Sequence, residues 1–139
     1  MIHIAIDGPA GAGKSTIARR VAEQIGFLYV DTGALYRAVG LFALRAGVDP
    51  ADAAAVEPLL PKISLSLAFA QGVQQVLLNG ENVSEAIRTP QVSMAASGVS
   101  AIPAVRRFLF SQQQDIARSN NVIMDGRDIG TVVLPDAQL

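Results

Sequence analysis

The chain has 139 residues, and half of them are hydrophobic, which is enough for one domain with a sizeable core. Its 11 basic and 12 acidic residues give a net charge of −1, so we expect no nucleic-acid partner. The lack of cysteine excludes disulfides and thiolate metal sites. No apolar stretch approaches the ~20 residues that span a bilayer, and no signal peptide is visible, so we expect a cytoplasmic protein without a membrane partner. We also expect a monomer.

The first two predicted elements flank the most informative motif. An apolar run at residues 2–6 predicts a buried strand, and apolar residues at helical spacing predict a helix over about residues 13–25, with Gly26 placed to end it. Between them the sequence fits the phosphate-binding pattern G-x-x-x-x-G-K-[ST]. The residues of this motif, with the one that follows, are Gly8, Pro9, Ala10, Gly11, Ala12, Gly13, Lys14, Ser15 and Thr16.

This motif suits a nucleoside triphosphate. Glycines let successive N–H groups point at phosphate oxygens, and a helix N-terminus adds the positive end of its dipole. Lys14 would reach the β- and γ-phosphates, and the Ser15 hydroxyl would ligate Mg²⁺. The alternative, a glycine-rich turn that only happens to precede a helix, is disfavoured because the strand and the helix occur in the required order.

The next elements alternate between strand and helix. Residues 27–30 predict a strand that ends in Asp31, and residues 34–46 predict a helix that ends at Gly47. Asp49 and Pro50 are suited to begin a short helix, which Pro58 and Pro61 would close.

From residue 63 the hydrophobic period changes to two. It predicts strands over residues 63–69 and 73–78, with a hairpin turn at Asn79 and Gly80, so a small antiparallel sheet would occupy about residues 63–84. Two helices follow, over about residues 89–100 and 103–120. Residues 122–124 predict another strand, which Asp125 ends before a loop over residues 126–130.

These elements predict an α/β protein with three layers, a mostly parallel sheet and a small inserted antiparallel sheet. The expected division is a first core part at 1–62, an inserted part at 63–102, and a return to the core at 103–139. Ligands in such sheets bind beyond the carboxyl ends of the strands, which gathers residues 8–15, 31–37 and 125–128 in one crevice. Asp31 and Asp125 could hold Mg²⁺ or its waters there, although a capping role is the alternative.

The arginines are the candidate phosphate ligands, because a planar guanidinium binds phosphate in a bidentate manner. Arg37 and Arg127 follow strands that lead into the crevice, and Arg106 begins a helix near the inserted segment. The remaining helix arginines are expected to be solvated surface charges; they are Arg19, Arg20, Arg45, Arg107 and Arg118.

Three motifs together resemble the bacterial cytidylate kinases. They are IDGPAGAGKS at residues 6–15, DTGALYR at residues 31–37 and DGRDIGTVV at residues 125–133. The resemblance covers the whole chain, and the second and third motifs are far more specific than the first. It implies a nucleoside-monophosphate-kinase fold of the P-loop type, in which the inserted part at 63–102 would bind the nucleoside monophosphate. It also implies ATP-dependent phosphorylation of CMP or dCMP, with Mg²⁺.

The same resemblance implies roles for individual residues. Arg37 and Arg127 would hold the CMP phosphate, with Thr32 nearby, and Lys14 would act with them in catalysis. Ser97, Arg106 and Asp128 would contact the cytosine edge, which offers an amine donor beside two acceptors. Uracil presents the opposite pattern at its 4-position and would leave Asp128 facing an acceptor.

The family continues past the position of Leu139 with another core strand, an arginine-bearing lid and an adenine-contacting segment, so we expect an N-terminal portion of such an enzyme. Two alternatives remain open. A P-loop kinase for another small acceptor, such as shikimate or gluconate, would explain the phosphate loop but not the 125–128 cluster. A nucleotide-switch protein of the GTPase type would need an N-K-x-D segment, and the sequence contains none.

Overall fold

The protein is represented by a computed structural model that describes the backbone of residues 3–7, 14–70 and 73–126. Side chains at positions 3, 5–7, 14–19, 69–70, 73, 119 and 124–126 fall outside that description. The chain divides into two compact units. The first unit comprises Met1–Thr32 and Gln113–Leu139, and the second unit comprises Gly33–Gln112.

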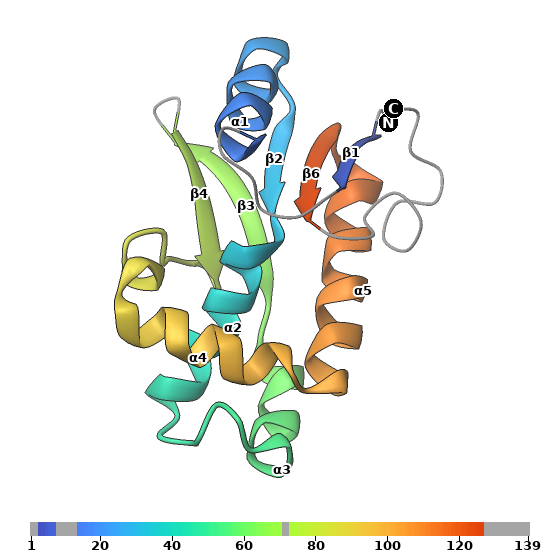
Figure 1. The fold of residues 1–139 in the computed structure, drawn as a ribbon. Coiled ribbons are helices and arrows are strands. Elements are labelled where there is room, and N and C mark those ends of the chain that lie inside the picture. The colour runs from blue at the N-terminus through green and yellow to red at the C-terminus, as the bar shows by residue number, and fades with distance from the viewer. Residues whose placement is uncertain (1–2, 8–13, 71–72, 127–139) are drawn as a thin grey trace. The chain divides into compact units, whose positions relative to one another are not determined.

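The first unit contains a parallel sheet of three strands, β1 (His3–Asp7), β2 (Leu28–Asp31) and β6 (Val122–Gly126), in the order β1-β6-β2 (Figure 1). All three strands were predicted, and β6 extends two residues further than expected. The register aligns Ile6 of β1 and Asp31 of β2 with Asp125 of β6. The carboxyl ends of the three strands therefore meet at one edge of the sheet.

Helix α1 (Lys14–Ile25) contacts this sheet through a small apolar cluster. Ala22 of the helix is buried with Phe27, Tyr29 and Ile123, and Ile4 packs against them. Tyr29, Ile123 and Ile4 are register partners across the three strands, so they lie on the same face of the sheet. Gly26 ends the helix as predicted, with φ of 75°.

The helices of the second unit pack around a core of aliphatic residues. Helix α2 (Thr32–Arg45) begins two residues before the predicted start, and its first residue belongs to the first unit. Helix α4 (Pro90–Ser100) follows its N-cap residue, Thr89, as predicted. The Thr89 hydroxyl accepts a hydrogen bond from the backbone N–H of Val92 at 3.2 Å. Helix α5 (Pro103–Ser119) follows and continues into the first unit. Within the described residues, no helix combines the length and apolar character required to cross a membrane.

The segment between α2 and the antiparallel sheet differs from the prediction. Asp49 does not begin a helix; its carboxylate accepts from the N–H of Ala51 at 3.0 Å and closes a turn instead. Asp52 is the N-cap of α3 (Ala53–Val56) and accepts from the N–H of Ala54 at 3.1 Å. Asp52 therefore begins the helix three residues after the predicted start at Asp49. Pro58 and Pro61 lie in the 3₁₀ helix that follows, η1 (Glu57–Lys62).

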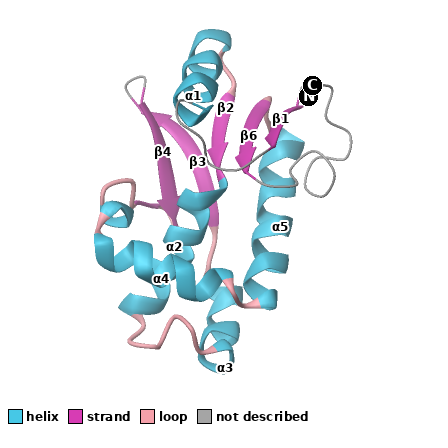
Figure 2. Ribbon diagram, viewed as in Figure 1, coloured by secondary structure: helices cyan, strands magenta, loops and turns pink. Residues whose placement is uncertain are grey.

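The predicted antiparallel sheet is confirmed. It consists of β3 (Leu65–Ala70), β4 (Val73–Leu78) and β5 (Glu81–Asn82), paired in that order (Figure 2). Asn79 and Gly80 connect β4 to β5 with φ of 51° and 84°. Positive φ at both central residues is the requirement of a type I′ hairpin turn. A short 3₁₀ helix, η2 (Ala86–Arg88), leads from this sheet to α4.

Candidate active site

The phosphate-loop motif has the predicted strand before it and the predicted helix after it. Strand β1 ends at Asp7 and helix α1 begins at Lys14, while residues 8–13 lie outside the described residues. Lys14, Ser15 and Thr16 form the first turn of α1. The N–H groups of a first helical turn have no intrahelical acceptor, so they are available to an anion.

Two aspartates occupy the edge of the sheet at which β1 leads into this motif. Asp31 is the last residue of β2 and is partly buried, and Asp125 is its register partner on β6. The predicted gathering of the three strand ends at one edge is therefore present in the backbone. Of the proposed Mg²⁺ ligands Ser15, Asp31 and Asp125, only Asp31 has a described side chain.

Arg37 stands apart from the other arginines of the described chain. It is partly buried on α2, whereas every other arginine with a described side chain is exposed. Within the described residues, no hydrogen bond or ion pair engages its guanidinium. By contrast, Arg45 on the same helix donates two hydrogen bonds to the Glu81 carboxylate, at 2.8 and 3.0 Å. A partly desolvated cation without a carboxylate partner is suited to an anionic ligand.

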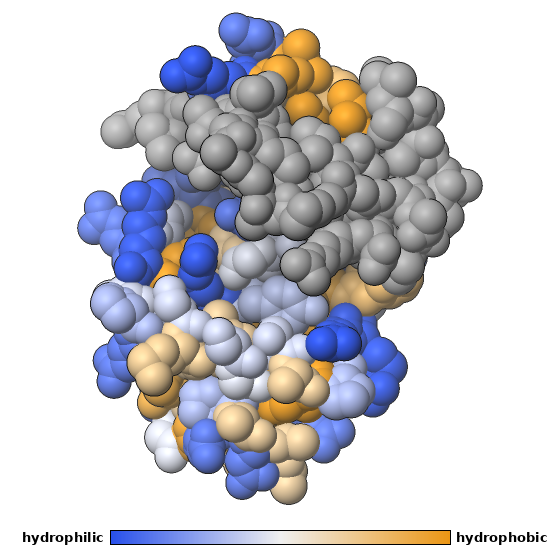
Figure 3. Space-filling model, viewed as in Figure 1, coloured by the Kyte–Doolittle hydropathy of each residue, from blue (hydrophilic) through white to orange (hydrophobic). Residues whose placement is uncertain are grey.

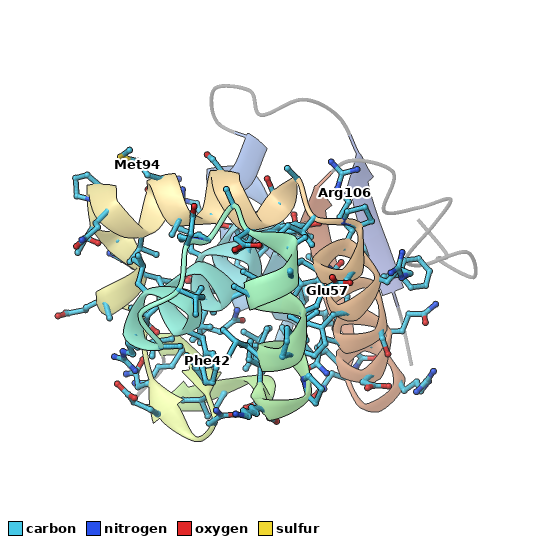
Figure 4. The ribbon with its side chains drawn as sticks, turned by 90° about the horizontal axis from the view of Figure 1, so that it is seen from below. Phe42, Glu57, Met94 and Arg106 are labelled. Atoms are coloured by element: carbon cyan, nitrogen blue, oxygen red, sulfur yellow. The ribbon has the colours of Figure 1, made fainter. Side chains whose placement is uncertain are left out.

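Arg106 lies in the first turns of α5, within the second unit. Its Nε donates to the backbone oxygen of Ser100 at 2.8 Å, where α4 gives way to α5 (Figure 4). Arg106 also acts on Tyr36, the residue before Arg37: burial raises the pKa of the Tyr36 phenol, and the positive charge of Arg106 opposes that rise. Sequence reasoning included Tyr36 only as part of the DTGALYR motif and did not anticipate the electrostatic effect of Arg106 on it.

Ser97 is exposed on α4. The described part of the face shown in Figure 3 carries hydrophilic and hydrophobic residues side by side. The Ser97 hydroxyl donates to the backbone oxygen of Ser93 in the preceding turn, at 3.4 Å. The lone pairs of the hydroxyl oxygen remain able to accept a hydrogen bond from a ligand amine.

The remaining predicted substrate residues are less fully described. Thr32 is the first residue of α2 and is partly buried. Arg127 and Asp128 lie outside the described residues. In the second unit, the charge of Arg106 acts on Tyr36, the neighbour of Arg37 on α2. The first unit brings together the strand ends beside the phosphate-loop motif.

Comparisons of the sequence with a family model and with curated relatives indicate the same family. A family model described as cytidylate kinase matches residues 4–139. The chain is 52% identical over 138 residues to the cytidylate kinase of Caldicellulosiruptor bescii, and 54% identical over 138 residues to that of Pelotomaculum thermopropionicum. Each alignment covers 99% of this chain and 61% of the relative. The cytidylate kinase of Oceanobacillus iheyensis is 49% identical, with 60% of its length covered. The chain therefore spans about three-fifths of the length of these curated relatives.

Proposed function

Because the chain belongs to the cytidylate kinase family, we propose that it is part of an enzyme that transfers the γ-phosphoryl group of ATP to CMP or dCMP. The fold of that enzyme would be the three-layer P-loop nucleoside-monophosphate-kinase fold. The observation that carries the proposal is that Arg37 is partly buried and that its guanidinium has no partner among the described residues. An acceptor substrate that carries a phosphate group would supply an anionic partner for this guanidinium.

The donor would bind at the start of α1. N–H groups of residues 8–16 would surround the β- and γ-phosphates, and the Lys14 ammonium would neutralise charge on the transferred group. Such electrostatic stabilisation is the main demand of phosphoryl transfer, since the protein supplies no nucleophile.

A magnesium ion fits the donor set at the same sheet edge. Asp31 and Asp125 occupy paired positions on neighbouring strands, and oxygen ligands are the ones that Mg²⁺ prefers. Ser15 and these carboxylates would hold the ion or its waters. When bound, the ion would neutralise charge on the phosphate oxygens.

Arginine side chains would hold the phosphate of the acceptor nucleotide. Arg37 and Arg127 would grip the CMP phosphate, with the Thr32 hydroxyl nearby. A phosphate oxygen of CMP would then attack the γ-phosphorus of ATP, so that a new P–O bond forms as the bond to the β–γ bridging oxygen breaks. ADP leaves with that bridging oxygen, and the product is CDP or dCDP.

The base would be recognised by complementary hydrogen bonds. Asp128 and the Ser97 oxygen would accept from the exocyclic amine side of cytosine, and Arg106 would donate to its acceptors. The exposed Ser97 oxygen and the Arg106 guanidinium, which uses its Nε on Ser100, support these roles.

The family match disfavours the two alternatives that sequence reasoning left open, a kinase for another small acceptor and a nucleotide-switch protein. The expectations of a monomer, of a cytoplasmic location and of no nucleic-acid partner stay predictions, as does the division at residues 62 and 102.

A coupled assay of ADP formation across the nucleoside monophosphates tests the proposal on the full-length protein. We expect turnover with CMP and dCMP, and a much lower kcat/KM with UMP. Asp128→Ala should narrow the ratio of kcat/KM for CMP over UMP, because the carboxylate would no longer favour an amine over a carbonyl. Preferred phosphorylation of AMP or GMP would refute the proposed substrate, and an unchanged CMP/UMP ratio would remove Asp128 from base recognition.

A further inference from the structure

Helices α2 and α4 pack closely at a glycine. A β-carbon placed on Gly40 would lie 2.9 Å from the backbone nitrogen of Ala96 and 3.0 Å from the carbonyl carbon of Ala95. These are backbone atoms of α4, which cannot swing aside as the end of a flexible side chain can. Since alanine is the better residue for a helix interior, the close approach is what requires glycine at this position.

The two helices that meet at this contact each carry a residue of the proposed acceptor site. Arg37 precedes Gly40 by three positions on α2, which is about 4.5 Å along the helix axis. Ser97 directly follows Ala96 on α4. Both helix segments belong to the second unit, so their spacing is a property of that unit alone.

We propose that Gly40 is a positioning residue, whose missing side chain sets the distance between Arg37 and Ser97 and thereby matches the acceptor site to the length of CMP. The inference rests on the proposed function, in which Arg37 holds the phosphate and Ser97 contacts the base. Because one nucleotide must reach both groups, a change in the α2–α4 spacing alters the fit of CMP but not that of ATP.

A second glycine fixes α4 on another side. A β-carbon on Gly98 would lie 3.2 Å from the backbone nitrogen of Ala51 and from the carbonyl carbon of Pro50. Gly98 follows Ser97, and Ser100 at the end of the same helix accepts the hydrogen bond from Arg106. Gly40 and Gly98 therefore hold the helix that carries Ser97 and anchors Arg106.

The test compares Gly40→Ala with Gly47→Ala in the full-length enzyme. Gly47 ends the same helix with φ of 75°, and a β-carbon there would meet no atom within 4 Å. Its replacement strains the backbone without pushing α2 and α4 apart, so it controls for loss of stability. We expect Gly40→Ala to raise the KM for CMP about tenfold and to leave the KM for ATP unchanged, whereas Gly47→Ala changes neither.

The outcomes separate the two proposals. If the unsubstituted enzyme does not phosphorylate CMP, the proposed function fails. If it does, and Gly40→Ala has the KM values of Gly47→Ala or raises both KM values together, the positioning role is overturned. Should Gly40→Ala fail to fold, it is combined with Ala95→Gly, because the Ala95 β-carbon is one of the atoms that the new side chain would meet, at 3.0 Å. The contact with the backbone nitrogen of Ala96 remains in the double variant, so an unchanged KM for CMP there would also overturn the inference.

Discussion

At the scale of single residues, burial and ion pairing together set Arg37 apart from the surface arginines. Arg45 pairs with Glu81, and Arg118 pairs with Asp115 one turn earlier on α5. Both pairs are exposed, and such pairs contribute little to stability. Arg37 is partly buried and has no such pair among the described residues. Its guanidinium is therefore available to a phosphate, which it could bind in a bidentate manner.

Lys14 is the residue on which the rate should depend most. Lys14→Ala in the full-length enzyme removes a cation from the transferred phosphoryl group, and we expect kcat to fall about 10²- to 10³-fold. The chain's other lysine, Lys62, is exposed at the end of η1 and provides the matched control. Near-normal kcat for Lys14→Ala would contradict the assignment of the phosphate loop.

Tyr36 makes stability depend on pH in the alkaline range. Burial raises the pKa of its phenol above the ordinary value of 10.0, although Arg106 acts in the opposite direction. The folded state therefore holds the proton more tightly than the unfolded state. The resulting stabilisation is complete below about pH 10 and is lost as the pH rises through the folded-state pKa.

We expect the free energy of unfolding to fall more steeply above about pH 10 in the unsubstituted protein than in Tyr36→Phe. Denaturant titrations over a series of pH values measure this difference. Arg106→Gln should extend the fall to higher pH, because it removes the charge that favours the phenolate. Parallel pH profiles for the unsubstituted protein and Tyr36→Phe would exclude a raised pKa at this position.

At the scale of elements, the hairpin turn shows what a local pattern can and cannot predict. Asn79 and Gly80 were identified from their type alone, because few other residues adopt positive φ at low cost. The side-chain contacts of Asn79 were not predictable. Its Oδ1 accepts from the N–H of Ser64 at 2.7 Å, and its Nδ2 donates to the oxygen of Lys62 at 3.0 Å. The turn is thereby joined to the segment that enters β3.

Asn79→Ala should lower the free energy of unfolding by about 2 kcal/mol, since it loses both hydrogen bonds and places alanine in a left-handed conformation. Asn79→Asp keeps the acceptor and tolerates the same backbone conformation, so its loss should be smaller. Denaturant unfolding of the two variants provides the comparison. Equal losses would show that the Ser64 contact contributes nothing.

Two predicted helix starts show the same limit of local patterns, because one is correct and the other is wrong. Thr89 and Pro90 were identified correctly, because a cap residue and a proline in the first turn coincide there. Asp49 and Pro50 form the same type of pair, yet the cap is Asp52. The sequence offers two aspartates three residues apart, and local preference does not distinguish the one that closes a turn from the one that begins a helix.

At the scale of the whole molecule, chain order and hydrophobic period were sufficient to predict a parallel sheet and a separate antiparallel sheet. They did not predict which helices share a core. The contact of Gly40 with Ala95 and Ala96 joins segments far apart in the sequence, and nothing local marks it. The phosphate-loop residues, Arg37, Arg127 and Asp128 were found through motifs, whereas the electrostatic effect of Arg106 on Tyr36 required the fold of the second unit.

The most direct test of the proposed phosphate ligand is the binding of CMP and cytidine to Arg37→Ala in the full-length protein, with the exposed Arg45→Ala as control. If Arg37 holds the phosphate, its removal should weaken CMP binding at least about tenfold and leave cytidine binding unchanged. Arg45→Ala should alter neither. Equal losses for CMP and cytidine, or no loss for CMP, would contradict the assignment of Arg37 as the group that holds the acceptor phosphate.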